Sequence, residues 1–288
     1  MSIRTMLVPL DGSEAAGSAL NLAFITAADL EAHVDVLHVG ADPRDAVPLL
    51  GEGMSGAMIE EMIEMAEAGA KEKAATARAM FDTAVSKHGI PVVEGPAGKD
   101  GASAAWIEDT GREEEVAVWR GRLTDLIVVG RPTGESDASR TMTLKASLTE
   151  TGRSVLVAPP VCPETLGRKV AVSWNGSREA ARAVANALPL IERSGSVVIL
   201  TADTDRTSVS MAPELSAYLA WHGITAEPRT FSPEGRGVGE ALLKECAEVN
   251  ADLLVLGAYT RSRMRQMLMG GVTTHVLAEA TVPLFMTR

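Results

Sequence analysis

Residues 7–16 read LVPLDGSEAA, an apolar stretch with strand character that runs into a turn and then into helix-forming residues. Residues 171–180 read AVSWNGSREA and repeat this order, with asparagine in place of aspartate. Two further segments recur later in the same order: His-Gly-Ile at 88–90 and 222–224, and an apolar run ending in glycine at 125–130 and 252–257. The chain therefore contains an internal repeat.

Short β-branched runs alternate with longer helical patterns between the matched points, which is typical of βαβ units and a parallel sheet. In the second half we expect strands near 169–174, 196–201, 224–229, 252–257 and 282–287. The prediction is an α/β protein with two tandem doubly wound domains, each a five-stranded parallel sheet flanked by helices. The domains are expected at 1–160 and 167–288, joined by the proline-rich residues 158–163.

The first half is longer because of an insertion at about residues 40–75. It reads as a loop over 40–56 followed by a long helical pattern. One interpretation is a solvated helix with a mobile entry loop. The other is that the loop, with Val-Pro-Leu-Leu at 47–50, covers the edge of the sheet where ligands bind.

Composition narrows the class of partner. The 288 residues include 27 Lys and Arg against 38 Asp and Glu, a formal net charge of -11, which disfavours binding to nucleic acid or anionic membranes. No signal sequence is apparent, and no apolar run reaches the ~18–20 residues that span a bilayer, so a cytoplasmic protein is expected. Cys162 and Cys246 stand alone, and neither they nor the five histidines have metal-ligand spacing.

In an open parallel sheet, ligands bind where the winding direction reverses, beside strand one and strand four. This places Asp11, Gly12 and Gly130 at one crevice, and Asn175 and Gly257 at another. Asp11 has two interpretations of equal weight: it caps the following helix, or it accepts hydrogen bonds from ligand hydroxyls. The acidic run at 113–115 is expected to be an exposed helix face.

After strand four, the second half has glycine at 257, then Thr260 and Arg261, and then Gly-Gly-Val-Thr at 270–273, opening the last helix. Glycines allow close backbone approach, and the helix start adds its positive dipole end, so the pattern favours a phosphate cradle. The alternative is a glycine-rich helix entry without a ligand.

The Asp-Gly-Ser turn, together with the spaced glycines before the last helix, resembles the universal stress protein family, and the whole chain is similar to a tandem member. The resemblance implies a five-stranded α/β unit in each half, paired through the fifth strands as a pseudo-dimer. It also implies, for one class of the family, ATP or AMP bound through the glycine motif. Three positions depart from that motif in the second half: Asn175 replaces the aspartate, Thr260 the middle glycine and Gly271 the serine. The first half keeps Asp11 and Gly130, but Thr-Leu at 143–144 stands where Gly-Ser would follow.

The resemblance and these observations predict a stress protein that binds ATP or AMP, without evident catalysis. Whether Mg²⁺ binds together with ATP stays open. The predicted main site lies in the second half and comprises Trp174, Asn175, Gly257, Thr260, Arg261, Gly270, Gly271, Val272 and Thr273. A weaker, degenerate site is predicted at Asp11, Gly12 and Gly130. The alternative is a nucleotide-free scaffold of the same family whose crevices are filled by side chains. An unidentified protein partner and a homodimer both stay open, and weak ATP hydrolysis is a third option.

Overall fold

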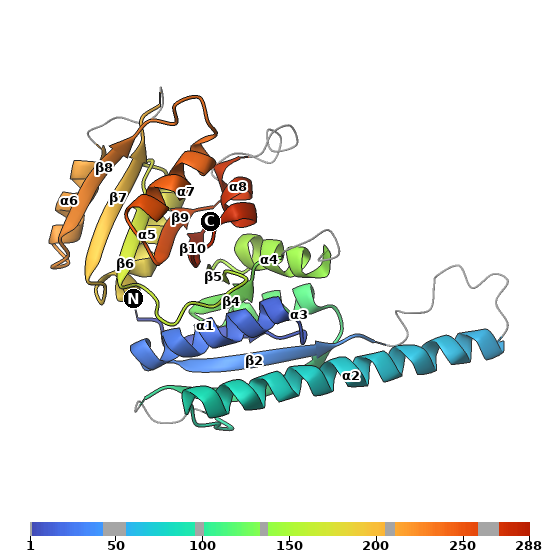
Figure 1. Cartoon of the computed structure of the whole chain (residues 1–288). Coiled ribbons are helices and arrows are strands. Elements are labelled where there is room, and N and C mark those ends of the chain that lie inside the picture. The colour runs from blue at the N-terminus through green and yellow to red at the C-terminus, as the bar shows by residue number, and fades with distance from the viewer. Residues whose placement is uncertain (1, 43–55, 96–100, 133–137, 205–210, 259–270) are drawn as a thin grey trace.

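The computed structural model describes residues 2–42, 56–95, 101–132, 138–204, 211–258 and 271–288. In this part of the chain, all strands join one ten-stranded sheet of order β3-β2-β1-β4-β5-β10-β9-β6-β7-β8, with helices on both faces (Figure 1). The predicted α/β class and the doubly wound arrangement of each half are confirmed. The domain boundaries at 160 and 167 stay a prediction.

Each half alternates strands and helices. The N-terminal half consists of β1 (Thr5–Pro9), α1 (Glu14–Leu30), β2 (His33–Gly40), α2 (Gly56–His88), β3 (Ser103–Thr110), α3 (Glu113–Gly121), β4 (Leu126–Gly130), α4 (Ala138–Glu150) and β5 (Ser154–Ala158). The C-terminal half consists of β6 (Lys169–Ser173), α5 (Arg178–Ile191), β7 (Ser196–Ala202), α6 (Met211–Ala220), β8 (Ala226–Phe231), α7 (Val238–Glu248), β9 (Leu253–Gly257), α8 (Val272–Glu279) and β10 (Leu284–Thr287). Apolar strands such as β1, β4 and β5 are almost wholly buried, because helices cover both faces of the sheet.

The two halves meet at one antiparallel pairing, between β5 and β10, whereas every other neighbouring pair of strands is parallel. Leu156 lies opposite Phe285, and both are completely buried. Buried hydrogen bonds stabilise one end of the β5–β10 pair. The hydroxyls of Ser154 and Thr287 are 2.8 Å apart, and the Asn186 side-chain amide donates to the Ser154 hydroxyl at 3.0 Å. Fifth strands therefore join the halves into one sheet.

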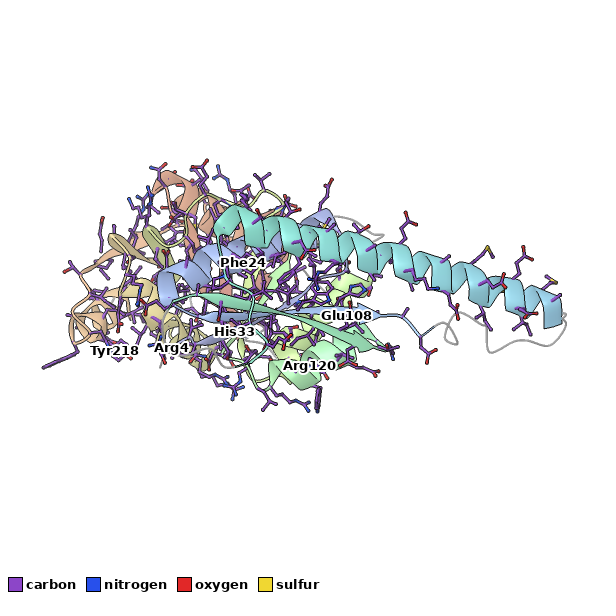
Figure 2. The ribbon with its side chains drawn as sticks, turned by 90° about the horizontal axis from the view of Figure 1, so that it is seen from below. Arg4, Phe24, His33, Glu108, Arg120 and Tyr218 are labelled. Carbon is purple, nitrogen blue, oxygen red and sulfur yellow. The ribbon has the colours of Figure 1, made fainter. Side chains whose placement is uncertain are left out.

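The inserted helix α2 has 33 residues, which corresponds to about 50 Å. Its buried residues, Ala77, Phe81 and Ala84, all lie in its C-terminal half. There Phe81 packs against Phe24 and Trp106, with ring centroids 6.5 and 5.4 Å apart. The N-terminal half of α2 projects beyond the body of the protein (Figures 1 and 2). The expected long helix is present, while the loop at 43–55 lies outside the described residues.

Candidate functional site: two crevices at the sheet edge

The reversal of winding occurs once in each half. β1 lies between β2 and β4, and β6 lies between β7 and β9, so the neighbouring carboxyl ends are those of β1 with β4 and of β6 with β9. These are the places where open α/β sheets bind ligands. They bring Asp11 near Gly130 in the first half, and Asn175 near Gly257 in the second.

The turns after β1 and β6 have the same local structure. Asp11 Oδ1 accepts a hydrogen bond from the Ser13 amide at 2.9 Å, and Asn175 Oδ1 accepts one from the Ser177 amide at 3.1 Å. Each serine then caps its helix, accepting from the amide three residues later. Gly12, with φ of +85°, turns the chain between strand and helix. The serines are therefore the helix caps, and Asp11 and Asn175 support the turn by holding the amide of the capping serine.

Glycine at the end of the fourth strand is needed for packing in both halves. A Cβ atom at Gly130 would lie 2.2 Å from the carbonyl oxygen of Ala15, and one at Gly257 would lie 2.6 Å from the amide nitrogen of Ala180. Real Cβ atoms do not approach other atoms so closely. The repeated glycine thus lets α1 and α5 pack against the strand ends, whether or not a ligand binds.

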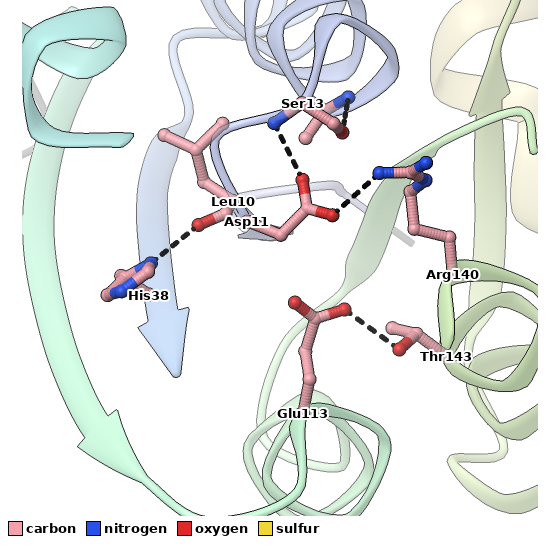
Figure 3. A network of polar contacts seen from close by, with 8 residues as sticks. Leu10, Asp11, Ser13, His38, Glu113, Arg140 and Thr143 are labelled. Carbon is pink, nitrogen blue, oxygen red and sulfur yellow. Dashed lines mark hydrogen bonds and ion pairs between the residues drawn. The ribbon is translucent and has the colours of Figure 1, made fainter. Parts of the chain in front are cut away.

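Side chains fill the N-terminal crevice (Figure 3). Arg140 of α4 forms an ion pair with Asp11, with Nη1 and Oδ2 3.0 Å apart. Glu113, at the start of α3, accepts a hydrogen bond from the Thr143 hydroxyl at 2.8 Å. The space left beside Gly130 is about 20 Å³, enough for roughly one water molecule.

The pKa values of the two carboxyl groups in this crevice are shifted in opposite directions. Burial alone would raise the pKa of Asp11, but hydrogen bonds from Ser13 and Arg140 and the charge of Arg140 lower it below its ordinary value. The pKa of Glu113 is raised, mainly by burial, and the charges of Asp11 and Glu114 add to the effect although the Thr143 hydrogen bond opposes it. The N-terminal crevice is thus an acidic pocket with one guanidinium in it.

The expectation that residues 113–115 form an exposed face holds for Glu115 and is wrong for Glu113 and Glu114; the Glu114 side chain, paired with Arg112, is 14% exposed. The three acidic residues open α3, and Glu113 is placed at the carboxyl edge of the sheet, where it points into the crevice beside Asp11 (Figure 3). Arg140 was also missed as a site residue. Its signal was its position in the first turn of the helix that follows β4, which in a doubly wound unit opens toward the same edge. The hypothesis of a loop cover at 47–50 lies outside the described residues.

The C-terminal crevice has a different set of groups. The Asn175 side chain is neutral and exposed, and Trp174 is partly buried against the core. Helix α8 begins with Gly271 as its N-cap, without a side-chain cap, whereas Ser13 and Ser177 cap α1 and α5. Val272 and Thr273 stand in the first turn of α8. The other predicted residues, Thr260, Arg261 and Gly270, lie outside the described part of the chain.

The described ranges contain no group of three or more His, Cys, Asp or Glu residues arranged to hold a metal ion. None of the described helices is long and apolar enough to cross a membrane. His38, at the N-terminal crevice, has a structural environment: it is buried, stacks on Trp106, and its Nδ1 lies 2.9 Å from the Leu10 carbonyl oxygen.

The model of the universal stress protein family matches residues 2–132 and 224–288. Three solved structures each cover 99% of this chain. The first is a universal stress protein from Archaeoglobus fulgidus, with a TM-score of 0.70, 18% identity and 98% of that chain covered. The second is a protein from Pseudomonas aeruginosa assigned to the universal stress proteins, with a TM-score of 0.58, 13% identity and 93% of that chain covered. The third is a functionally unknown protein from Pseudomonas aeruginosa, with a TM-score of 0.56, 13% identity and 92% of that chain covered. At these identities the structures show a shared fold. Comparison with curated proteins found no match. The family match covers most of the sequence and confirms the resemblance of the strand–turn motifs: the chain belongs to the universal stress protein family.

Proposed function

We propose that this universal stress protein binds an adenine nucleotide, ATP or AMP, at the carboxyl edge of β6 and β9. The observation that carries the proposal is the start of α8, which has no side-chain cap, and which follows the strand that ends at Gly257. The first amides of a helix have no partner inside the helix and attract anions. The family resemblance supplies the ligand class.

The two crevices differ in charge, and this difference favours the C-terminal one. In the N-terminal crevice Arg140 is paired with Asp11, Glu113 adds a second carboxyl, and about 20 Å³ remains beside Gly130, which leaves little space and no net positive charge for a phosphate. In the C-terminal half, the position equivalent to Asp11 is the neutral Asn175. An anion binding there meets no carboxylate at that position, and the buried Glu179 next to Gly257 is paired with Arg178 and Arg182.

Roles follow from the chemistry of the candidate residues. Asn175 offers an amide oxygen to a ribose hydroxyl, and Trp174 precedes it at the end of β6. The backbone amides at Gly270, Gly271 and Val272 and the hydroxyl of Thr273 are the proposed phosphate donors, and Thr260 and Arg261 are further candidates. A Mg²⁺ ion would accompany ATP through the phosphates.

Calorimetric titration with ATP, ADP and AMP, each with and without Mg²⁺, tests the proposal. We expect binding with Kd below 1 mM. The substitution Asn175→Ala should weaken it about fivefold, the loss of one hydrogen bond of ~1 kcal/mol. The matched substitution Asp11→Ala, at the equivalent turn, should leave affinity unchanged. Absence of binding at millimolar nucleotide would overturn the proposal, and an effect of Asp11→Ala alone would move the site to the first half.

The filled N-terminal crevice supports a second candidate function, a nucleotide-free scaffold that acts through protein contacts. In this case neither half binds nucleotide, and the side chains around Asp11 serve stability only. Both candidates describe a binding protein without catalysis in the cytoplasm. A hydrolysis assay at ATP concentrations below Kd checks this point: turnover of ATP that is equal in wild type and Asn175→Ala would reveal a site elsewhere or a contaminating enzyme.

A further inference from the structure

We propose that the projecting half of α2 and the cavity at its base form a docking groove for a basic amphipathic helix of a partner protein. This inference is independent of nucleotide binding, because it concerns the insertion and the β2–β3 end of the sheet. The groove is defined by the apolar stripe of α2 at Ile59, Met62, Ile63, Ala66 and Ala70, and by the cavity that begins at Ala70.

The stripe has helical spacing and lies on one side of α2. Its members follow the i, i+3, i+4, i+7, i+11 pattern of an amphipathic helix. The same pattern continues into Ala77, Phe81 and Ala84, which are buried against the body. The stripe therefore continues the packing side of α2 along its projecting part, where all five of its residues are partly buried. Figure 2 shows this part of the helix clear of the sheet.

The cavity at the base of the helix continues the stripe toward the sheet. It has a volume of about 310 Å³ and lies between α2 and the carboxyl ends of β2 and β3. Ala70, Lys71 and Ala74 form its helix wall, and His38, Glu108 and Asp109 are on the strand side. The small alanine side chains leave depth for a large side chain from a helix lying along the stripe.

Charge identifies the occupant. Residues 56–74 contain five glutamates, at positions 60, 61, 64, 67 and 72, against two lysines, Lys71 and Lys73, so this part of α2 is acidic overall. An apolar stripe that includes methionine and has Glu60 and Glu67 along one side is complementary to a helix with apolar residues on one face and Lys or Arg beside them. Two copies of this chain paired along the same stripe would instead bring two acidic segments together, so a second copy is disfavoured.

A designed peptide tests the groove. The probe is an 18-residue fluorescent peptide of leucine and lysine in amphipathic helical order, and the control probe has the same composition in scrambled order. Fluorescence anisotropy with the full chain should show at least tenfold tighter binding of the ordered peptide. The triple substitution Glu60→Lys, Glu64→Lys, Glu67→Lys should weaken that binding at least tenfold.

Matched variants separate docking from general attraction to an acidic protein. The triple reversal Glu192→Lys, Glu214→Lys, Glu227→Lys changes the net charge equally at exposed sites of the C-terminal half and should leave binding unchanged. Ile63→Gln should weaken binding tenfold, whereas Met65→Gln, off the stripe and 62% exposed, should not.

Two results would overturn the proposal. One is equal loss of peptide binding in the two triple variants, since the attraction would then be non-specific. The other is a dimer in sedimentation velocity that Ile63→Gln dissociates, since the groove would then be occupied by a second copy. Far-UV circular dichroism of each variant verifies that the helix content is retained.

Discussion

Gly130 and Gly257 show that a repeated residue at a crevice can be required by packing alone. Because a Cβ atom would overlap the backbone of α1 or α5, Gly130→Ala and Gly257→Ala should each lower the free energy of unfolding by about 1–3 kcal/mol. Urea unfolding measures the loss. The control is Gly69→Ala, on exposed helix with no atom within 4 Å of the added carbon, which should gain ~0.5–1 kcal/mol. A neutral Gly257→Ala would show that the strand end tolerates a shift of α5.

Glu113 is the residue whose role depends most on pH. Its folded-state pKa is raised by burial, so its contribution to stability is complete below the ordinary pKa of 4.5 and is lost as pH rises through the folded-state pKa. Glu113→Gln removes the charge and keeps an oxygen for Thr143. We expect it to raise the free energy of unfolding by about 1 kcal/mol at pH 7 and to have little effect at pH 4.

Urea unfolding of both proteins at the two pH values measures this difference. Glu115→Gln is the control, since Glu115 in the same acidic run is 66% exposed and should change stability by less than ~0.5 kcal/mol at either pH. A Glu113→Gln protein that is less stable than wild type at pH 7 would show that the carboxylate is stabilising there.

At the scale of the element, the start of α8 links helix stability to the proposed site. Gly271→Ser supplies the missing N-cap and should add a few tenths of a kcal/mol to the free energy of unfolding. The same hydroxyl can accept from the helix amide and donate its own proton to a phosphate, so ATP affinity should rise about fivefold, the gain of one hydrogen bond of ~1 kcal/mol. Gly237→Ser, at the similarly uncapped start of α7, should give the same stability gain without an effect on ATP. Equal ATP affinities in the two variants would argue against phosphate at α8.

Helix α2 consists of two parts with different energetics. Phe81→Ala removes a fully buried ring that packs between Phe24 and Trp106, and should cost ~3–5 kcal/mol. Ile63→Ala, on the projecting part, should change the free energy of unfolding by less than ~0.5 kcal/mol. Thermal and urea denaturation measure both. A large loss in Ile63→Ala would mean that the stripe is already covered within the chain, and the docking groove would then be wrong.

Sequence reasoning located most elements because apolar strands and glycine turns recur in both halves. It placed the second-half strands within about two residues, and it placed Asp11 beside Gly130 from the winding rule alone. It did not find the ion pair of Asp11 with Arg140, or that the Glu113 side chain points into the crevice. These depend on how α3 and α4 sit over the edge of the sheet, and a run of three glutamates has the same local signature whether one of them faces inward or all face solvent.

At the scale of the whole molecule, the joined sheet gives the two halves shared apolar cores. The apolar cores on both faces of the sheet include residues from β1 and β4 together with residues from β6 and β9, and they pass through the β5–β10 pair. The internal repeat predicts two structural units, but it does not predict how strongly unfolding of one destabilises the other. That energetic coupling depends on how much apolar surface is buried where β5 and β10 pair.

The junction leads to a prediction about cooperativity. Phe285 is completely buried at the centre of the joined sheet, and Phe285→Ala should cost ~3–5 kcal/mol. If the halves unfold together, far-UV circular dichroism and tryptophan fluorescence should report one coincident urea transition in wild type. Trp106 and Trp119 report on the first half, and Trp174 and Trp221 on the second. Replacing each pair by phenylalanine in turn isolates one half, and Phe285→Ala should shift both signals by the same amount. A shift confined to the C-terminal tryptophans would show that the halves unfold independently despite the shared sheet.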